Sequence, residues 1–131
     1  MDYKDSKIIF NKKEIRWGNH DIMHIKEKEF IQKQAKDIMK LKPKSILELG
    51  YGLGLTAEIF KDSPKHLIVE IHPEIAQAAR EAGYVVWEGD AKDFRSDEVW
   101  DVVYDDLYRI EPVDIEDKIK YNKYIKFEIC R

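Results

Sequence analysis

The sequence holds a single cysteine, Cys130, so it can form neither an internal disulfide nor a zinc cluster built from cysteines. It has no apolar run near the ~18 residues of a membrane-spanning helix and no apolar signal-peptide segment at its start, so we expect a cytoplasmic protein. It also lacks an excess of positive charge. With 23 Lys and Arg against 26 Asp and Glu, the net charge of −3 disfavours general binding to nucleic acid or anionic membranes.

The length of the chain predicts one domain. With 131 residues it can bury a hydrophobic core, and no linker, repeat or low-complexity tract divides it. We therefore treat 1–131 as a single domain in which 1–20 form an N-terminal arm or lid, either two short strands or an extended arm. A helix is predicted from about Asp21 to Leu41. Its expected buried positions include Ile22, Ile25, Phe30, Ile38 and Leu41.

Three alternate glycines, Gly50, Gly52 and Gly54, follow an apolar run that begins at Ser45, and a helical pattern starts near Thr56. This order predicts a strand, a tight turn and a helix. Glycine permits positive φ and close approach to a ligand, while the first N–H groups of a helix favour an electron-rich group. Such turns bind ligands in open α/β sheets. The dinucleotide fingerprint G-x-G-x-x-G is not met, because Leu55 occupies the position where, counting from Gly50, the fingerprint requires its third glycine.

The same rhythm continues downstream, because strand-like and helix-like segments alternate. Strands are predicted at Ser45–Leu49, Leu67–Glu70, Tyr84–Trp87 and Trp100–Asp105, and helices are predicted at about 55–61 and 73–83. Alternation of this kind predicts a parallel sheet. The tail over 115–131 fits either a strand or a broad helical face, and its periodicity does not decide between them.

The pattern Glu48-x-Gly50-x-Gly52-x-Gly54 resembles motif I of the class I S-adenosylmethionine-dependent methyltransferases. Glu70 is similar to the ribose-binding acid of that superfamily, and Asp90-Ala91 to its adenine turn. Trp100–Asp106 resembles motif IV, which carries acids toward the substrate. The resemblance implies a truncated Rossmann-like α/β fold with about four parallel strands in the order 3-2-1-4 and helices on both faces. A nucleotide-binding α/β domain of another kind is the alternative.

A closer resemblance is to the N-terminal part of the guanidinoacetate and arginine N-methyltransferase group. It rests on Arg16-Trp17 with Met23-His24, and on the motifs Leu47–Gly54, Ile68–Glu70 and Trp100–Tyr108. That group carries a helix after motif IV, which favours a helix over 115–131. It also continues with a fifth strand and an antiparallel pair that this chain lacks. The fourth-strand edge would then be open, and we expect a homodimer to cover it, with the tail or another subunit as alternatives.

The resemblance implies a set of site residues. The expected cofactor contacts are Glu48, Gly50, Tyr51, Gly52, Gly54, Glu70, Asp90 and Ala91, the expected substrate or lid residues are Trp17, Met23 and Tyr108, and the expected catalytic residues are Asp105 and Asp106. A carboxylate at the end of the fourth strand can orient an amine and accept its proton.

Each of these side chains also has a structural interpretation. Glu48 could hydrogen-bond a loop, Glu70 could be solvated and Asp90 could form a turn. Trp17 and Tyr51 could pack in the core. The neighbouring Asp105 and Asp106 could end a strand or bind a metal. His20 and His24 have ligand-like spacing but no third partner in sequence, so we expect no metal site.

These observations favour S-adenosylmethionine-dependent N-methylation of a small amine or guanidino-type substrate. The alternative is a non-catalytic S-adenosylmethionine-binding module that acts through a partner. Nucleic-acid methylation is disfavoured by the net charge and by the absence of an N-P-P-[YF] type motif.

Overall fold

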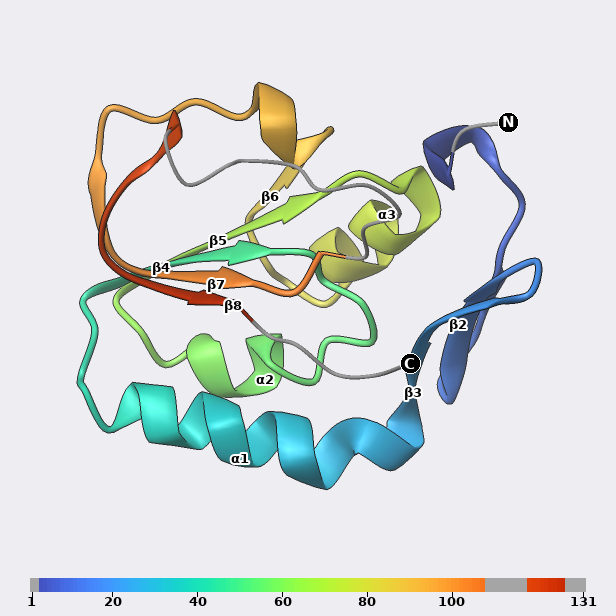
Figure 1. Ribbon diagram of the computed structural model, residues 1–131, viewed down its shortest axis with the longest axis horizontal. Helices are drawn as coiled ribbons and strands as arrows, with labels where there is room; N and C mark the ends of the chain where they lie inside the picture. The colour runs from blue at the N-terminus through green and yellow to red at the C-terminus, as the bar shows by residue number, and fades with distance from the viewer. Residues whose placement is uncertain (1–2, 108–117, 127–131) are drawn as a thin grey trace.

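A computed structural model of the protein describes residues 3–107 and 118–126, and Figure 1 shows a small sheet beside a larger one. The small sheet is antiparallel and has the order β1-β2-β3, with β1 at Ile9–Phe10, β2 at Glu14–Trp17 and β3 at His20–His24. The larger sheet is parallel and has the order β6-β5-β4-β7-β8. Its strands are β4 (Ser45–Leu49), β5 (Lys65–Glu70), β6 (Val86–Glu88), β7 (Val99–Asp105) and β8 (Lys120–Lys126).

Helices connect the strands in the predicted rhythm. The α-helices are α1 (Lys28–Met39), α2 (Ala57–Phe60) and α3 (Pro73–Glu81), and the 3-10 turns are η1 (Tyr3–Asp5), η2 (Ile25–Glu27) and η3 (Ala91–Asp93). The start of α3 shows how local sequence places these elements. Pro73 occupies its first turn, the His72 ring accepts from the Glu74 backbone N–H, and Gly83 follows its end with φ +96°.

The two faces of the larger sheet are covered differently. Ile46 on β4 packs with residues of α1, α2 and α3, such as Ile38, Phe60 and Ile75, in one core cluster. The alternate residue Leu47 faces the opposite side, where η3 and the residue after it pack. Figure 1 shows α1 and α2 below the sheet and η3 above it. The described α-helices therefore pack on one face of the sheet, and the short 3-10 helix η3 packs on the other.

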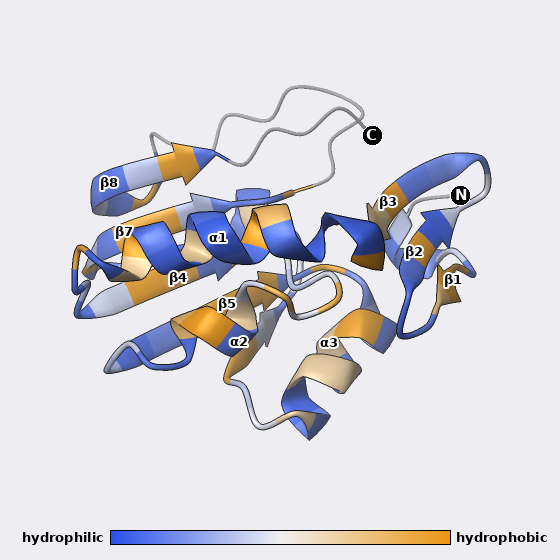
Figure 2. Cartoon of the chain, turned by 90° about the horizontal axis from the view of Figure 1, so that it is seen from below, coloured by the Kyte–Doolittle hydropathy of each residue, from blue (hydrophilic) through white to orange (hydrophobic). Residues whose placement is uncertain are grey.

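The predicted helix from Asp21 begins too early. Residues 20–24 form β3, which pairs with β2, and the regular helix α1 starts only at Lys28. The apolar residues Ile22 and Met23 are buried by pairing and packing rather than by a helical face. Within α1 the buried residues are Ile31, Ala35 and Ile38. Phe30 and Leu41, which the helical pattern had placed inside, are 60% and 55% exposed. In Figure 2 hydrophilic residues dominate the visible surface of α1.

The predicted strand count of four and the predicted helix in the tail are both wrong. The predicted order 3-2-1-4 corresponds to β6-β5-β4-β7, but β8 adds a fifth strand beside β7, so the complete order differs. The backbone groups along β7 need hydrogen-bond partners, and the tail supplies them in parallel register, with Val103 opposite Tyr124. The open edge that motivated a homodimer is therefore not on β7. Association of two copies stays a prediction without that support.

Among the described residues, no helix is both long enough and apolar enough to cross a membrane.

Candidate functional site

The glycine turn directly follows β4. Gly50, Gly52 and Gly54 have φ values of +93°, +59° and +77°, a region that side-chain-bearing residues rarely adopt. A Cβ at Gly50 would lie 2.9 Å from the backbone oxygen of Asp106, which follows β7. Strain and close approach thus both require glycine here. The turn lies at the carboxyl end of a central parallel strand, where α/β sheets bind ligands.

Glu70, at the end of β5, holds this turn in place. Its carboxylate accepts the backbone N–H of Tyr51 at 2.9 Å and the backbone N–H of His72 at 2.9 Å. The side chain is buried, and burial raises the pKa of the Glu70 carboxyl, while the N–H groups of His72 and Tyr51 act in the opposite direction. The solvated interpretation of Glu70 is therefore wrong. The Gly52 backbone N–H also bonds this carboxylate, so the expected ribose contact would use a lone pair that the three bonds leave open.

The raised pKa of Glu70 predicts that this side chain destabilises the fold more as the pH rises. A carboxyl whose pKa is higher in the folded than in the unfolded state stabilises the fold below the unfolded pKa, and this contribution is lost as pH rises through the folded pKa. Glu70→Gln cannot ionise. We expect it to gain stability relative to the wild type between pH 4.5 and pH 7.5 in urea denaturation. If the difference in unfolding free energy between Glu70→Gln and the wild type stays constant with pH, or shifts in favour of the wild type as pH rises, the raised pKa of Glu70 is contradicted.

Glu48 is held inside the domain by two protein contacts. It lies on the same face of β4 as Ile46, which is the face that α1 and α2 cover, and it is fully buried. One carboxylate oxygen accepts from the Thr56 hydroxyl and the other lies 2.8 Å from His66 Nε2. Both oxygens are therefore engaged by protein groups. These two contacts fit the structural interpretation of Glu48, and the expected cofactor contact stays a prediction.

Thr56→Val tests this structural role of Glu48. Thr56 precedes α2, but its hydroxyl makes no capping bond to that helix, so the variant removes only the donor to Glu48. A buried carboxylate oxygen left without a donor costs about 2 kcal/mol, and we expect the free energy of unfolding to fall by that amount. Thr56→Ser keeps the hydroxyl and serves as the control. Equal stability of the two variants in chemical denaturation would show that the bond contributes nothing.

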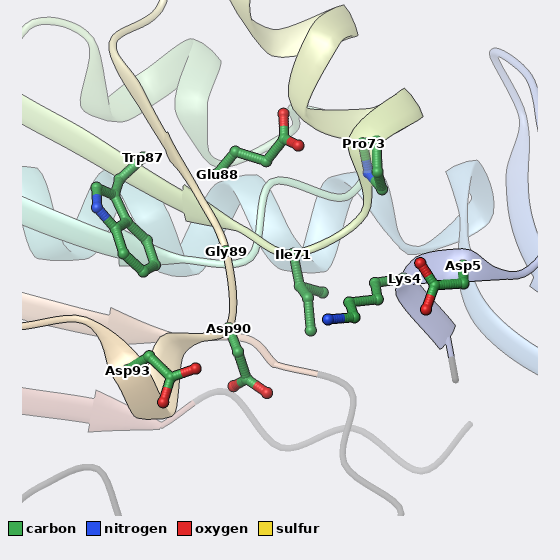
Figure 3. A pocket seen from close by; sticks show the side chains of 9 residues that line it. All are labelled: Lys4, Asp5, Ile71, Pro73, Trp87, Glu88, Gly89, Asp90 and Asp93. Carbon is green, nitrogen blue, oxygen red and sulfur yellow. The ribbon is translucent and has the colours of Figure 1, made fainter. Parts of the chain in front are cut away.

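A cavity of about 340 Å³ opens at the carboxyl ends of β5 and β6. Figure 3 shows the residues around it, which are Lys4, Asp5, Ile71, Pro73, Trp87, Glu88, Gly89, Asp90 and Asp93. Ile71 directly follows Glu70 in sequence, but the lining includes neither Glu70 itself nor a residue of the glycine turn. Trp87 and Ile71 give it apolar walls, and carboxylates dominate its charged lining. Ligands of small-molecule size fill concave sites of this kind.

Asp90 and Ala91 take different places at this cavity. The Asp90 carboxylate accepts the Lys92 backbone N–H at 3.0 Å and so caps η3, as the turn interpretation predicted, yet it also lines the cavity. Ala91 is buried in the core beneath. Asp90 thus remains available for a ligand contact, whereas Ala91 supports the turn through its packing.

The small sheet reaches the glycine turn through Met23. The Leu53 backbone N–H points to the Met23 sulfur at 3.3 Å, and a Cβ at Gly52 would lie 2.7 Å from the Met23 methyl carbon. Trp17 instead stacks on Tyr3, with ring centroids 5.3 Å apart. Tyr51 folds over its own turn toward Gly54, and burial raises the pKa of its phenol to about 12. Met23 therefore packs on the glycine turn and Trp17 packs on Tyr3, and their role toward a substrate stays a prediction.

Asp105 is the last residue of β7 and pairs with Leu49, the last residue of β4. Both strands therefore end at the side of the sheet where the glycine turn begins. It is 1% exposed, and its carboxylate accepts the Leu107 backbone N–H and the Tyr124 hydroxyl. Asp105 packs on the opposite face of the sheet from Glu48, so the two acids do not meet. Asp106 is half-buried and its backbone N–H donates to Leu49. Tyr108 lies outside the described residues.

Sequence reasoning missed several residues that shape the site. Lys4 and Asp5 line the cavity although they stand far from it in sequence, and His72 joins β5 to the N-terminus. Only His72 carried a local signal, because it precedes a proline that starts a helix. Within the described residues no group of three His, Cys, Asp or Glu side chains is placed to hold a metal ion.

No protein-family model and no curated protein matches the sequence. Solved structures do match the fold. A candidate caffeoyl-CoA O-methyltransferase from Staphylococcus aureus is 20% identical, with a TM-score of 0.50 over 57% of this chain and 43% of that protein. CalS10 from Micromonospora echinaspora, an amino pentose methyltransferase solved with SAM bound, is 20% identical, with a TM-score of 0.47 over 66% and 37% of the two chains. The methyltransferase PaMTH1 from Podospora anserina, solved with SAH bound, is 24% identical, with a TM-score of 0.47 over 62% and 40%.

The chain spans less than half the length of each of these proteins. The likeness to the Staphylococcus aureus structure shows the fold, a parallel Rossmann-like sheet with helices as found in methyltransferases.

Proposed function

We propose that the protein binds S-adenosylmethionine at the glycine turn and transfers its methyl group to nitrogen of a small molecule. The observation that carries this proposal is the turn itself. Three glycines with positive φ follow β4, the Glu70 carboxylate accepts a backbone N–H of their turn, and a cavity of about 340 Å³ lies at the ends of the neighbouring strands β5 and β6. Motif I of the resembling superfamily has the same glycine spacing. Glu70 and Asp90 would hold the ribose and adenine ends.

The acidic lining of the cavity supports S-adenosylmethionine over a dinucleotide. Lys4 is the one cationic side chain among its described lining residues, against the carboxylates of Asp5, Glu88, Asp90 and Asp93. Arg80 and Lys92 pair with Glu88 and Asp90, so a small excess of negative charge remains, and the pyrophosphate of NAD would find no cationic partner beyond Lys4 in the lining. A cationic sulfonium compound needs no such partner.

When bound, S-adenosylmethionine supplies an electrophilic methyl group on its sulfonium. The chain must then orient the acceptor nitrogen and take up the proton that nitrogen releases as its new bond to carbon forms. Asp105 stands at the strand end where both tasks can be met, since each carboxylate oxygen can accept more than one hydrogen bond. Burial of this acid keeps water away from the reacting atoms.

The acceptor class follows from the same acids. The carboxylates of Asp105 and Asp106, at and after the end of β7, fit an amine or guanidino group better than an acidic acceptor. The residues around Gly18 and Asn19 and the pair Asp106-Leu107 depart from the guanidinoacetate and arginine group. We therefore propose a small amine, with a guanidino compound as one member of the class.

A direct experiment is to incubate the protein with S-adenosylmethionine and a panel of amines, among them guanidinoacetate, arginine and an amino sugar, and to measure S-adenosylhomocysteine. We expect product above the no-acceptor control with at least one amine. Product formation that does not depend on any acceptor would argue against the proposal.

The second candidate is a binding module without turnover. One observation favours it: Asp105 is almost fully buried, and both of its oxygens already accept hydrogen bonds from Leu107 and Tyr124. An acid held in this way can be structural. Substitution of Asp105 separates the two candidates, because a pure binder has no turnover to lose.

A further inference from the structure

One wall of the cavity comes from a part of the chain that is distant in sequence. Lys4 and Asp5 of η1 face Ile71 and Asp90, which lie at the ends of β5 and β6. Figure 3 shows the Lys4 side chain extending from η1 into the cavity on the side of Ile71 and Asp90. We call Tyr3–Ser6 the N-terminal cover. It borders the cavity without belonging to the parallel sheet.

His72 makes two of the contacts that attach the N-terminal cover to the domain. The Tyr3 ring lies 5.1 Å from the His72 ring and 5.3 Å from the Trp17 ring, centroid to centroid. The backbone oxygen of Ser6 lies 2.9 Å from His72 Nε2. Tyr3 is half-buried, and burial raises the pKa of its phenol. Because Lys4 and Asp5 are exposed and the segment pairs with no strand of the parallel sheet, it can open while that sheet stays intact.

His72 also connects the cover to the glycine turn. Its Nδ1 accepts a hydrogen bond from the Glu74 backbone N–H. Nε2 therefore carries the ring proton and donates a hydrogen bond to the backbone oxygen of Ser6. Its own backbone N–H donates to Glu70, whose carboxylate also accepts the Tyr51 N–H of the turn. One buried residue thus contacts the cover, the start of α3 and the acid that shapes the turn.

We propose that His72 is a positioning residue that fastens the N-terminal cover over the cavity, and that the cover closes behind the nucleoside end of bound S-adenosylmethionine and slows its release. This inference rests on the proposed function. The cover borders the cavity from outside the sheet, so its opening would widen the cavity mouth without unfolding β5 or β6. A ligand between Ile71, Trp87 and the cover would in turn hold the cover closed.

The dissociation rate of S-adenosylmethionine tests the proposal, because a fastening residue controls escape. Trp87 lines the cavity and provides a fluorescence signal for stopped-flow measurement. His72→Asn keeps a side-chain acceptor for the start of α3 but loses the Ser6 bond and the ring contact with Tyr3. We expect it to release S-adenosylmethionine about tenfold faster than the wild type, as the loss of one hydrogen bond and one aromatic contact implies.

Tyr3 gives the matched test from the side of the cover. Tyr3→Ala removes the ring that contacts His72 and should speed release about fivefold, whereas Tyr3→Phe keeps the ring and should stay within about twofold of the wild type. In the double variant of Tyr3→Ala and His72→Asn the two effects should not multiply, because both changes break the same attachment. Independent effects would show that the residues act separately.

Limited trypsin digestion supplies a readout that a merely structural role would not change. Lys4 and Lys7 lie in and beside the cover, whereas the exposed Lys12 and Lys13 follow β1 and serve as internal controls. We expect S-adenosylmethionine to slow cleavage after Lys4 and Lys7 in the wild type, to protect them less in His72→Asn, and to leave cleavage after Lys12 and Lys13 unchanged.

The outcomes are distinguishable when binding is first established by calorimetry. If S-adenosylmethionine binds but release rates and cleavage at Lys4 and Lys7 are the same in the wild type and in His72→Asn, the cover is refuted and the proposed function stands. If the wild type binds no S-adenosylmethionine, both are refuted.

Discussion

Asp105→Asn is expected to lower the rate of methyl transfer by at least about 100-fold while leaving the affinity for S-adenosylmethionine within a few fold of the wild type. The amide can still accept the Leu107 N–H and still pair with the Tyr124 hydroxyl, so the end of β7 should keep its packing. What the amide cannot do is accept a proton, and the loss of a positioned general base typically costs 10²-fold to 10⁴-fold in rate. Single-turnover formation of S-adenosylhomocysteine measures this loss.

Asp101→Asn is the matched control, because it changes the same type of side chain at the other end of the same strand. Asp101 accepts the Lys44 backbone N–H at 2.7 Å and the Asn122 amide at 3.1 Å. Its substitution should affect stability but not the chemical step. If Asp105→Asn keeps full turnover, Asp105 is not the base. If neither the variant nor the wild type turns over any acceptor while both bind S-adenosylmethionine, the binding-module alternative is correct.

Gly50→Ala is expected to abolish measurable binding of S-adenosylmethionine. An added Cβ at φ +93° is strained, and it would lie 2.9 Å from the Asp106 backbone oxygen, which cannot move away as a flexible side chain could. Relief of that contact would separate the end of β4 from the end of β7 and displace the backbone that receives the ligand. We expect a loss in binding of at least about 100-fold, together with a loss of stability above the 1–3 kcal/mol that backbone strain alone costs.

Gly83→Ala isolates the backbone contribution. Gly83 has φ +96°, nearly the value at Gly50, but a Cβ there would meet no atom within 4 Å. It should lose stability through strain alone and bind S-adenosylmethionine as the wild type does. Thermal unfolding and titration of both variants compare the two effects directly. Equal affinities of Gly50→Ala and Gly83→Ala would show that the glycine turn is not the binding site.

Elements whose conformation depends on residues close to them in sequence were predicted well. The apolar run before Gly50, the proline that starts α3 and the glycine after its end set β4, the turn and α3 close to their observed bounds. These signals depend on φ preferences and on a missing N–H, which act within a few residues.

Elements decided by distant partners were predicted badly. Residues 120–126 fit a helix and a strand equally well by period, and the strand forms because the edge of β7 offers hydrogen bonds to it. Residues 20–24 likewise become β3 through pairing with β2. Local periodicity contains no information on which edge is free.

The same division applies to the site. The glycine turn and the place of Glu70 at a strand end were predictable because glycine spacing is local and strand ends follow from the sheet. The contacts of Glu48 with Thr56 and His66 were not, because they depend on which face of β4 the helices cover. The contribution of Lys4 to the cavity could not be predicted, because it depends on how the N-terminus folds back onto β5 and β6.

Isothermal titration of the wild-type protein with S-adenosylmethionine and, separately, with NAD tests the central claim most directly, with the mass in solution determined on the same sample. We expect saturable micromolar binding of S-adenosylmethionine and none of NAD, because the glycine spacing and the acidic cavity favour a cationic sulfonium ligand. The mass would show whether two copies associate. Binding of NAD, or no binding of S-adenosylmethionine at millimolar concentration, would contradict the account.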